Sequence, residues 1–286
     1  MRSALPWLAA MTLSCSGQAP ATLDPALRER ALAGLRAGLH SPEFWPSMHA
    51  AEGLTQAGLG SEVVSSLTPR LPVETDDQRR CGLARELIRA GVEAPVSVLT
   101  AILNDTQSKG RVHASESLFK LNRVGNREAL VAALNEGNPT LEMMAAAALA
   151  QQGDPAALAT LRARLADAEL GNRRIAAWVL GQVGGPQDCA PLRALAEAET
   201  EALARSFYWN ALARLGAPGA LAVVVQDLEA NEEAVRAYAA ETLGACGTRA
   251  QLPRLEARLN DAALDARLRA AAAILGLLKL PAGLAP

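Results

Sequence analysis

Apolar and polar positions repeat along this chain with a period of about 31 residues. Successive copies of the frame start 33, 31, 31, 31, 32, 31 and 31 residues apart. In most copies the second, third, sixth and ninth positions are apolar or small, and at this spacing they share one face of an α-helix. The pattern therefore predicts eight helices of similar length, whose frames start at His49, Gly82, His113, Met144, Ile175, Phe207, Tyr238 and Arg269.

Two landmarks indicate how each predicted helix ends and how the next begins. Leu occupies the sixth position of seven copies, and Ile274 occupies it in the last. Seven copies carry Gly or Asn at the tenth position, where a left-handed residue can terminate a helix: Gly58, Gly91, Asn122, Gly153, Gly184, Gly216 and Gly247. A second helix starts beyond this point, most clearly at Asp154-Pro155, with Asp as the cap and Pro in the first turn.

Each unit is thus predicted to be a helix, a turn and a helix. One such unit cannot bury its apolar face alone, so neighbouring units must stack against each other. We expect an all-α fold, an α-solenoid of about eight two-helix repeats that forms a continuous superhelical rod. The last helix, from Leu268 to Leu280, is almost entirely apolar. It is expected to form an interface or to be covered by residues 281–286.

A row of arginines accompanies the frame, two residues before its start in six copies: Arg80, Arg111, Arg173, Arg205, Arg236 and Arg267. An acid precedes most of them by six residues, at Glu74, Asp105, Asp167, Glu199 and Asp261, with Ala230 breaking the row. We interpret the two rows as a structural ladder of ion pairs rather than as a phosphate-binding or sulfate-binding strip. The arrangement resembles the HEAT-repeat family. The short unit and the Arg-x-Ala-Ala-x-x-Leu-Gly pattern, seen at Arg236 to Gly244, resemble the bilin-lyase type of HEAT repeat.

Composition excludes several classes of protein. Of the 286 residues, 50% are hydrophobic and only 3% are aromatic, the formal net charge is −2 and the pI is about 6.0. Such an apolar chain is not disordered, and it lacks the excess of basic residues that a nucleic-acid binder needs. We expect no stretch long and apolar enough to span a bilayer. A composition rich in Ala and Leu suits thin layers of closely packed helices.

The first residues are predicted to be a sorting signal. Arg2 is followed by a short apolar run, and Ala19-Pro20-Ala21 forms a small-x-small cleavage site, which gives a signal peptide at 1–21 and a solenoid at 22–286. Alternatively, the stretch from Thr12 to Cys15 resembles a bacterial lipoprotein box, with Cys15 as the lipidated residue and Thr12 where Leu is usual. A third interpretation is a frayed apolar N-terminus. The other three cysteines show no zinc-site spacing, and we interpret them as buried small residues.

Candidate binding residues lie at frame positions one, four and eight, which point away from the apolar stripe. In HEAT-like solenoids the second helices line the concave face, so these side chains should face a groove. Aromatic residues gather late in the chain and can act as hot spots, although Trp209 and Phe207 could equally fill space in the core. The partner-binding candidates are His49, Glu52, Arg85, His113, Glu116, Trp178, Tyr208, Trp209, Tyr238 and Glu241.

Two His-x-x-Glu pairs, His49 with Glu52 and His113 with Glu116, place both side chains on one helix face. Deoxyhypusine hydroxylase, an enzyme of the HEAT-repeat family, binds iron through His-Glu dipeptides, but this sequence has none. The two pairs also lie two units apart, roughly 16–20 Å at the usual spacing of packed helices. One ion cannot bridge that distance. We therefore expect no metal, no cofactor and no catalytic residues, and we interpret the pairs as His–Glu hydrogen bonds.

These observations predict a non-catalytic binding module or interaction scaffold of the bacterial cell envelope. Its partner is expected to be another protein, such as an envelope enzyme or complex, with no nucleic acid and with contact to a membrane only through a lipid anchor. The alternative is an enzyme or enzyme-accessory protein, related to metals or carbohydrates, that uses the His/Glu-bearing N-terminal end of the groove. The stretch from Phe44 to Glu52 resembles exported repeat proteins of polysaccharide-degrading bacteria.

Overall fold

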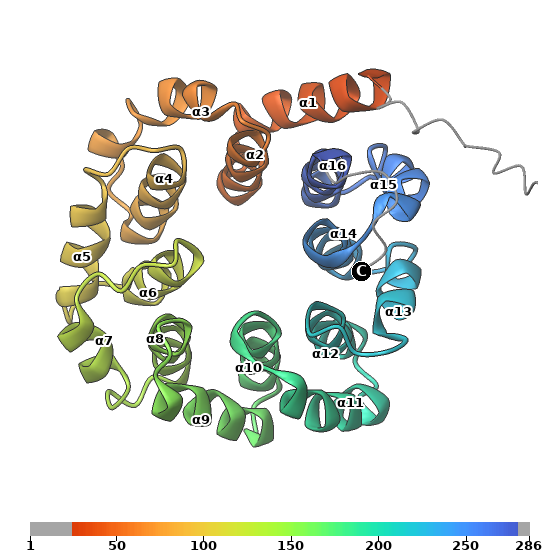
Figure 1. Cartoon of the computed structure of the whole chain (residues 1–286). Coiled ribbons are helices and arrows are strands. Elements are labelled where there is room, and N and C mark those ends of the chain that lie inside the picture. Colours follow the sequence, from red (N-terminus) through yellow and green to blue (C-terminus); the bar gives the residue numbers. More distant parts are fainter. Residues whose placement is uncertain (1–24, 280–286) are drawn as a thin grey trace, which may run out of the picture.

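A computed structural model describes residues 25–279, and in this range the chain folds into sixteen α-helices and four short 3-10 helices without any strand (Figure 1). The eight helices that follow the predicted frame form an inner layer: α2 (Phe44–Gln56), α4 (Asp77–Arg89), α6 (Arg111–Lys120), α8 (Pro139–Gln151), α10 (Leu170–Val183), α12 (Ala202–Arg214), α14 (Glu233–Cys246) and α16 (Leu264–Lys279). The other helices form an outer layer: α1 (Pro25–Leu39), α3 (Gly60–Leu67), α5 (Val96–Asn104), α7 (Arg127–Ala133), α9 (Pro155–Ala163), α11 (Cys189–Ala198), α13 (Ala220–Asp227) and α15 (Leu252–Arg258). The all-α solenoid prediction is confirmed.

The solenoid closes on itself. Helix α16, at the end of the described chain, packs against α1 and α2 at its start as well as against its neighbours α14 and α15 (Figure 1). The eight inner helices therefore form an unbroken ring, in which each inner helix packs on the next and α16 packs on α2. The sequence predicted stacked units in an open rod. In this structure the two ends of the rod pack on each other, so that the units form a ring.

Ring closure explains the composition of the last helix. Its apolar side chains are buried, Leu268 and Ile274 among them, because α1 and α2 cover them. Glycines on the facing helices make the room. A Cβ atom at Gly38 would lie 2.4 Å from a methyl carbon of Leu268, and one at Gly53 would lie 3.0 Å from the Cβ atom of Ala272. The expected interface on this helix is thus formed within the chain itself.

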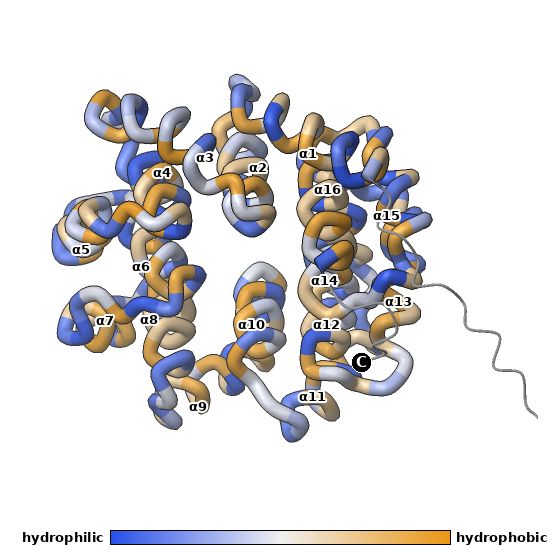
Figure 2. The backbone as a smooth tube through the Cα atoms, turned by 45° about the horizontal axis from the view of Figure 1, so that its top comes forward, coloured by the Kyte–Doolittle hydropathy of each residue, from blue (hydrophilic) through white to orange (hydrophobic). Residues whose placement is uncertain are grey.

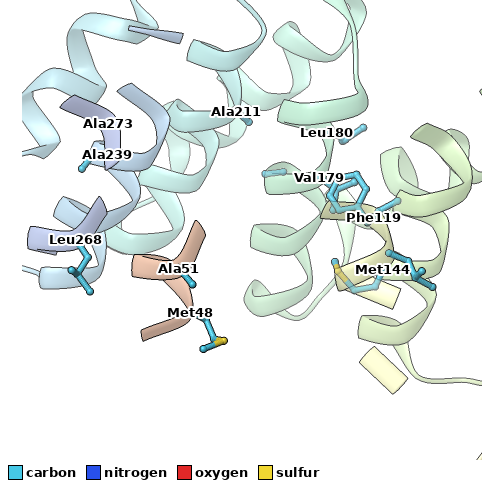
Figure 3. Packing of buried hydrophobic residues seen from close by; sticks show 14 of the residues in the cluster. Met48, Ala51, Phe119, Met144, Val179, Leu180, Ala211, Ala239, Leu268 and Ala273 are labelled. Carbon is cyan, nitrogen blue, oxygen red and sulfur yellow. The ribbon is translucent and has the colours of Figure 1, made fainter. Parts of the chain in front are cut away.

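Small residues also bring the inner helices close together. A Cβ atom at Gly181 would lie 2.8 Å from Cα of Ala211, and one at Gly244 would lie 3.0 Å from Cα of Ala273, so that the backbones of paired inner helices nearly touch. Figure 3 shows side chains from both ends of the chain in one continuous buried cluster. This close packing explains how a core of this size needs so few aromatic residues.

Glycine at the tenth frame position ends the inner helices in two ways. Four glycines and Asn122 adopt a positive φ, as predicted. The prediction is wrong for Gly184 and Gly247, whose φ angles are −77° and −81°. Both still need to be glycine, because a Cβ atom would lie 2.4 Å from the carbonyl oxygen four residues earlier. The predicted cap at Asp154 is confirmed, since its side chain accepts hydrogen bonds from two backbone amides of α9.

Arg173 and Arg236 of the arginine row join neighbouring units through acids of the predicted row. Arg236 donates to the backbone carbonyl of Ala230 at 2.8 Å and, through two nitrogens at 2.7 Å, to the carboxylate of Asp261 in the next unit. Arg173 likewise reaches Glu199 of the next unit at 3.9 Å. Within a unit Arg173, Arg236 and Arg267 donate to the backbone carbonyl at the acid position, and therefore Ala230 can interrupt the row.

Hydrophilic and hydrophobic residues alternate along the helices, and few helices are uniformly apolar (Figure 2). No helix within residues 25–279 is both long and apolar enough to cross a membrane. The predicted signal peptide and the lipidation candidate Cys15 lie outside the described residues.

Candidate functional site

The ring encloses a chamber of about 550 Å³ that is lined by side chains from all eight inner helices. Most of these helices contribute the side chain at the same position of the repeat frame. The residues at frame position one face the chamber in seven of the eight units, namely His49, His113, Met144, Ile175, Phe207, Tyr238 and Arg269. Gly82 is the exception, because Phe44 packs 3.0 Å from where its Cβ atom would be.

A second, lower cavity of about 310 Å³ lies toward the C-terminal ends of the inner helices. Residues at frame position eight line it, among them Gln56, Arg89, Gln182 and Arg214. Five side chains line both cavities and so stand between them, and we call this set the waist: His49, Lys120, Trp178, Glu241 and Arg269.

Ion pairs connect the charged side chains on the N-terminal half of the ring. Buried Glu86 accepts hydrogen bonds from Arg85 at 2.7 Å and from Arg89, and Arg89 also reaches Glu52 at 3.2 Å. Burial works to lower the pKa of Arg85, but the carboxylates of Glu86, Glu116 and Glu52 outweigh it and raise that pKa. These side chains hold each other in fixed positions around the cavity wall.

Glu52 and Glu116 remain ionised because of the cations beside them. Burial favours their neutral forms, yet Arg89, Lys120 and Arg85 lower the pKa of Glu52 to about 2. The pKa of Glu116 is also lowered to about 2 against the effect of burial, mainly by Lys120, whose ammonium lies 2.7 Å away. Neither carboxylate is poised to exchange a proton near neutral pH.

The C-terminal half of the ring carries a second network. Arg269 pairs with Glu241 of the preceding unit and with Asp265 of its own helix at 2.9 Å. Glu241 also lies 3.5 Å from Arg214. These pairs cross three inner helices, so the waist is held by contacts between units as well as within them.

His49 links the two halves of the ring. Its Nδ1 lies 2.5 Å from Asp265 Oδ1, and its Nε2 lies 3.2 Å from a guanidinium nitrogen of Arg269. Since Arg269 can only donate, Nε2 must accept, which leaves the proton on Nδ1 and the ring neutral. Burial and the charge of Arg269 lower the pKa of His49, in agreement with this tautomer.

Aromatic side chains cover much of the chamber wall. Trp45 stacks on His113 with ring centroids 5.2 Å apart, and Phe207 packs on Tyr238 at 4.6 Å. The ammonium of Lys120 lies 5.3 Å from the centre of the Trp178 ring. The chamber therefore offers flat apolar surfaces next to charged groups.

One guanidinium in the chamber differs from the others. Arg174 lies 5.9 Å above the Phe207 ring and forms no ion pair with any residue of the range 25–279. The other five cations around the two cavities, Arg85, Arg89, Lys120, Arg214 and Arg269, all pair with Glu52, Glu86, Glu116, Glu241 or Asp265. Six cations thus line the cavities, five of them are paired with these acids, and Arg174 is the unmatched one.

The structure corrects the interpretation of the two His-x-x-Glu pairs. His49 bonds to Asp265 and Arg269 rather than to Glu52, and Glu116 bonds to Lys120 rather than to His113. The Nδ1 atom of His113 is buried without a hydrogen-bond partner in the described part of the chain, and burial lowers its pKa. Residues 25–279 contain no group of three His, Cys, Asp or Glu side chains placed to hold a metal ion.

Eight of the ten candidate residues lie around the two cavities, and two do not. Tyr208 is fully buried in the core, and Trp209 packs on the outer layer, with the guanidinium of Arg193 5.4 Å from its ring. Both follow frame position one, where the helix turns away from the chamber. Sequence analysis missed Trp45 and Arg174. Trp45 precedes frame position one by one helical turn, and extending the frame by a turn would have found it.

One known repeat family matches part of the chain. Residues 95–178 and 127–209 match the family model of HEAT repeats. A solved structure of human deoxyhypusine hydroxylase in complex with glycerol is similar at 21% identity and a TM-score of 0.40, over 88% of this chain and 97% of that one. The crystal structure of an engineered protein is similar at 17% identity and a TM-score of 0.32, over 87% and 83% of the two chains. No curated protein matches the sequence.

Proposed function

We propose that this chain, which matches the HEAT-repeat family model over residues 95–209 and whose solenoid closes into a ring, is a binding module that takes a short polypeptide segment of a partner protein into the chamber. The observation that carries the proposal is the convergence of all eight inner helices on one cavity of about 550 Å³. A surface that every unit contributes to is preformed by the fold and loses little entropy on binding.

The residue types on the chamber wall favour a polypeptide over a small organic molecule. Pockets for small organic molecules are lined mainly by apolar groups with a few polar ones. The wall of this chamber is also mainly apolar, but it sets several guanidinium groups beside Trp45, Trp178 and Tyr238. Trp, Tyr and Arg are the residue types that dominate the energetics of protein interfaces.

The size of the chamber limits the partner to a segment. A volume of about 550 Å³ falls in the range of about 300–1,000 Å³ that holds a single compact ligand. A folded domain is far larger than this space. The sequence predicted a groove, and in the closed ring we infer that one segment enters a half-open chamber in its place.

A variant that fills the chamber tests the proposal. Ala234 lines the chamber on α14, and Ala234→Trp would occupy part of its volume. Ala222 is exposed on the outer helix α13, so Ala222→Trp is the matched control. Immobilised protein is incubated with a pool of acetylated tetrapeptides of random sequence, and the retained peptides are identified by mass spectrometry. We expect wild type and Ala222→Trp to retain peptides and Ala234→Trp to lose them, whereas equal retention by all three proteins contradicts the proposal.

We further propose that the module acts in the bacterial cell envelope, as the segment 1–21 suggests. The mass of the mature protein after expression in an exporting bacterial host tests this. A chain that starts after Ala21, or a lipidated chain that starts at Cys15, supports export. A chain that retains residues 1–21 unmodified contradicts it.

A further inference from the structure

The charges around the two cavities cancel except at one place. The five paired cations are held by carboxylates, so they are largely neutralised as recognition groups. Arg174 has no carboxylate within ion-pair distance among residues 25–279, although it lines the chamber. A half-buried guanidinium in such a half-open, partly apolar space favours an anion from outside the chain.

The surroundings of Arg174 indicate what is attached to that anion. Arg174 lies on α10 next to Ile175 and one turn from Trp178, and the Phe207 ring of α12 lies beneath its guanidinium. The side chains next to Arg174 on the chamber wall are therefore apolar or aromatic. A carboxylate that pairs with Arg174 through two parallel hydrogen bonds would bring an attached apolar group against these surfaces.

The waist favours a chain end over a continuous segment. Arg269 contacts both His49 and Glu241 there, and Lys120 lies against the Trp178 ring. A polypeptide that ran from the chamber into the lower cavity would have to pass between these side chains. A chain that stops above the waist leaves all of their contacts intact.

We propose that the chamber recognises the C-terminus of the partner. This inference rests on the proposed function and adds the chemistry of the ligand to it. The terminal carboxylate pairs with Arg174, and the last side chain, apolar or aromatic, packs on Phe207, Ile175 and Trp178. An N-terminus carries an ammonium group in place of the carboxylate, and Arg174 repels it.

Two peptide pools test the proposal on the unmodified protein. Both contain acetylated tetrapeptides of random sequence, and they differ only in their C-termini, which are free acids in one pool and amides in the other. We expect wild type to retain the acid pool at least about tenfold better than the amide pool, as the loss of one charged hydrogen-bonded pair implies. Arg174→Gln should remove this preference. Arg193→Gln, which alters a guanidinium over Trp209 outside the chamber, should keep it.

The possible results separate the two claims. Equal retention of acid and amide pools overturns the C-terminus proposal and leaves the binding function standing. Retention of amides rich in Asp or Glu also overturns it, because the anion would then be a side chain. If wild type retains neither the acid pool nor the amide pool, the binding function itself is overturned. N-acetyl-phenylalanine is tested alongside, and if it binds as tightly as the best tetrapeptide acid, the site takes a small free acid rather than a chain end. The wild-type comparison stands even if Arg174→Gln does not fold.

Discussion

The imidazole Nδ1 of His49 lies 2.5 Å from the carboxylate oxygen Oδ1 of Asp265, and this contact joins two residues that are 216 positions apart. One residue belongs to the first inner helix and the other to the last. The contact therefore lies at the seam where the solenoid becomes a ring, and the same histidine lines both the chamber and the lower cavity. Closure of the ring and formation of the site depend on the same side chains.

Loss of the seam carboxylate should destabilise the protein. Asp265→Ala removes one hydrogen-bond partner of His49 and one of Arg269, and both of these side chains are partly buried. We expect the free energy of unfolding in urea to fall by about 1–3 kcal/mol. The control Glu29→Gln removes an exposed ion pair with Arg28 on α1 and should cost less than about 1 kcal/mol. Equal effects of the two variants would show that the seam contributes no special stability.

Stability should decrease in mild acid because of His49. Burial and Arg269 lower its pKa in the folded protein, so below the ordinary value of 6.5 the unfolded chain binds more protons than the folded one. The free energy of unfolding is therefore highest above about pH 6.5 and falls as the pH drops through the lowered pKa. His113, whose pKa is also lowered, contributes in the same direction. Urea titrations near pH 7.5 and 5.5 should show a smaller pH dependence for His49→Gln, and an unchanged dependence contradicts this assignment.

Asp227 should give the stability of the protein the opposite pH dependence. Burial raises the pKa of this carboxyl, at the end of α13, to about 6, and its Oδ2 has no hydrogen-bond partner within the described chain. The folded protein therefore binds this proton more tightly than the unfolded chain, and stability is lost as the pH rises through about 6. We expect Asp227→Asn to raise the free energy of unfolding by about 1 kcal/mol at pH 8. The gain should be smaller near pH 5, and a gain of the same size at both values contradicts the assignment.

Local features of the fold could be read from the sequence because each depends on a few neighbouring residues. The helix cap at Asp154 and the inward register of frame positions one and eight follow from helical periodicity alone. The same periodicity places Tyr208 and Trp209 at frame positions two and three, on the buried face; only the clustering of aromatic residues made them binding candidates.

Ring closure could not be predicted in this way, because it depends on small rotations between units that add up over eight repeats. The sequence does carry a trace of it, in the apolar last helix and in the small residues Gly38 and Gly53 that receive that helix. Each of these features has a local interpretation when it is taken alone. The partners of His49 were equally hidden, since Asp265 and Arg269 approach it only when the ends of the solenoid meet.

Zero-length cross-linking tests ring closure most directly. Arg30 of α1 and Glu256 of α15 lie 2.6 Å apart across the seam, and Arg30→Lys supplies an amine that a carbodiimide can join to that carboxylate. Arg36→Lys with Glu62, a similarly exposed pair 2.9 Å apart between α1 and α3, is the matched control for the chemistry. A closed ring predicts both amide cross-links in the monomer fraction by mass spectrometry. Appearance of the control cross-link without the one between residues 30 and 256 would contradict closure.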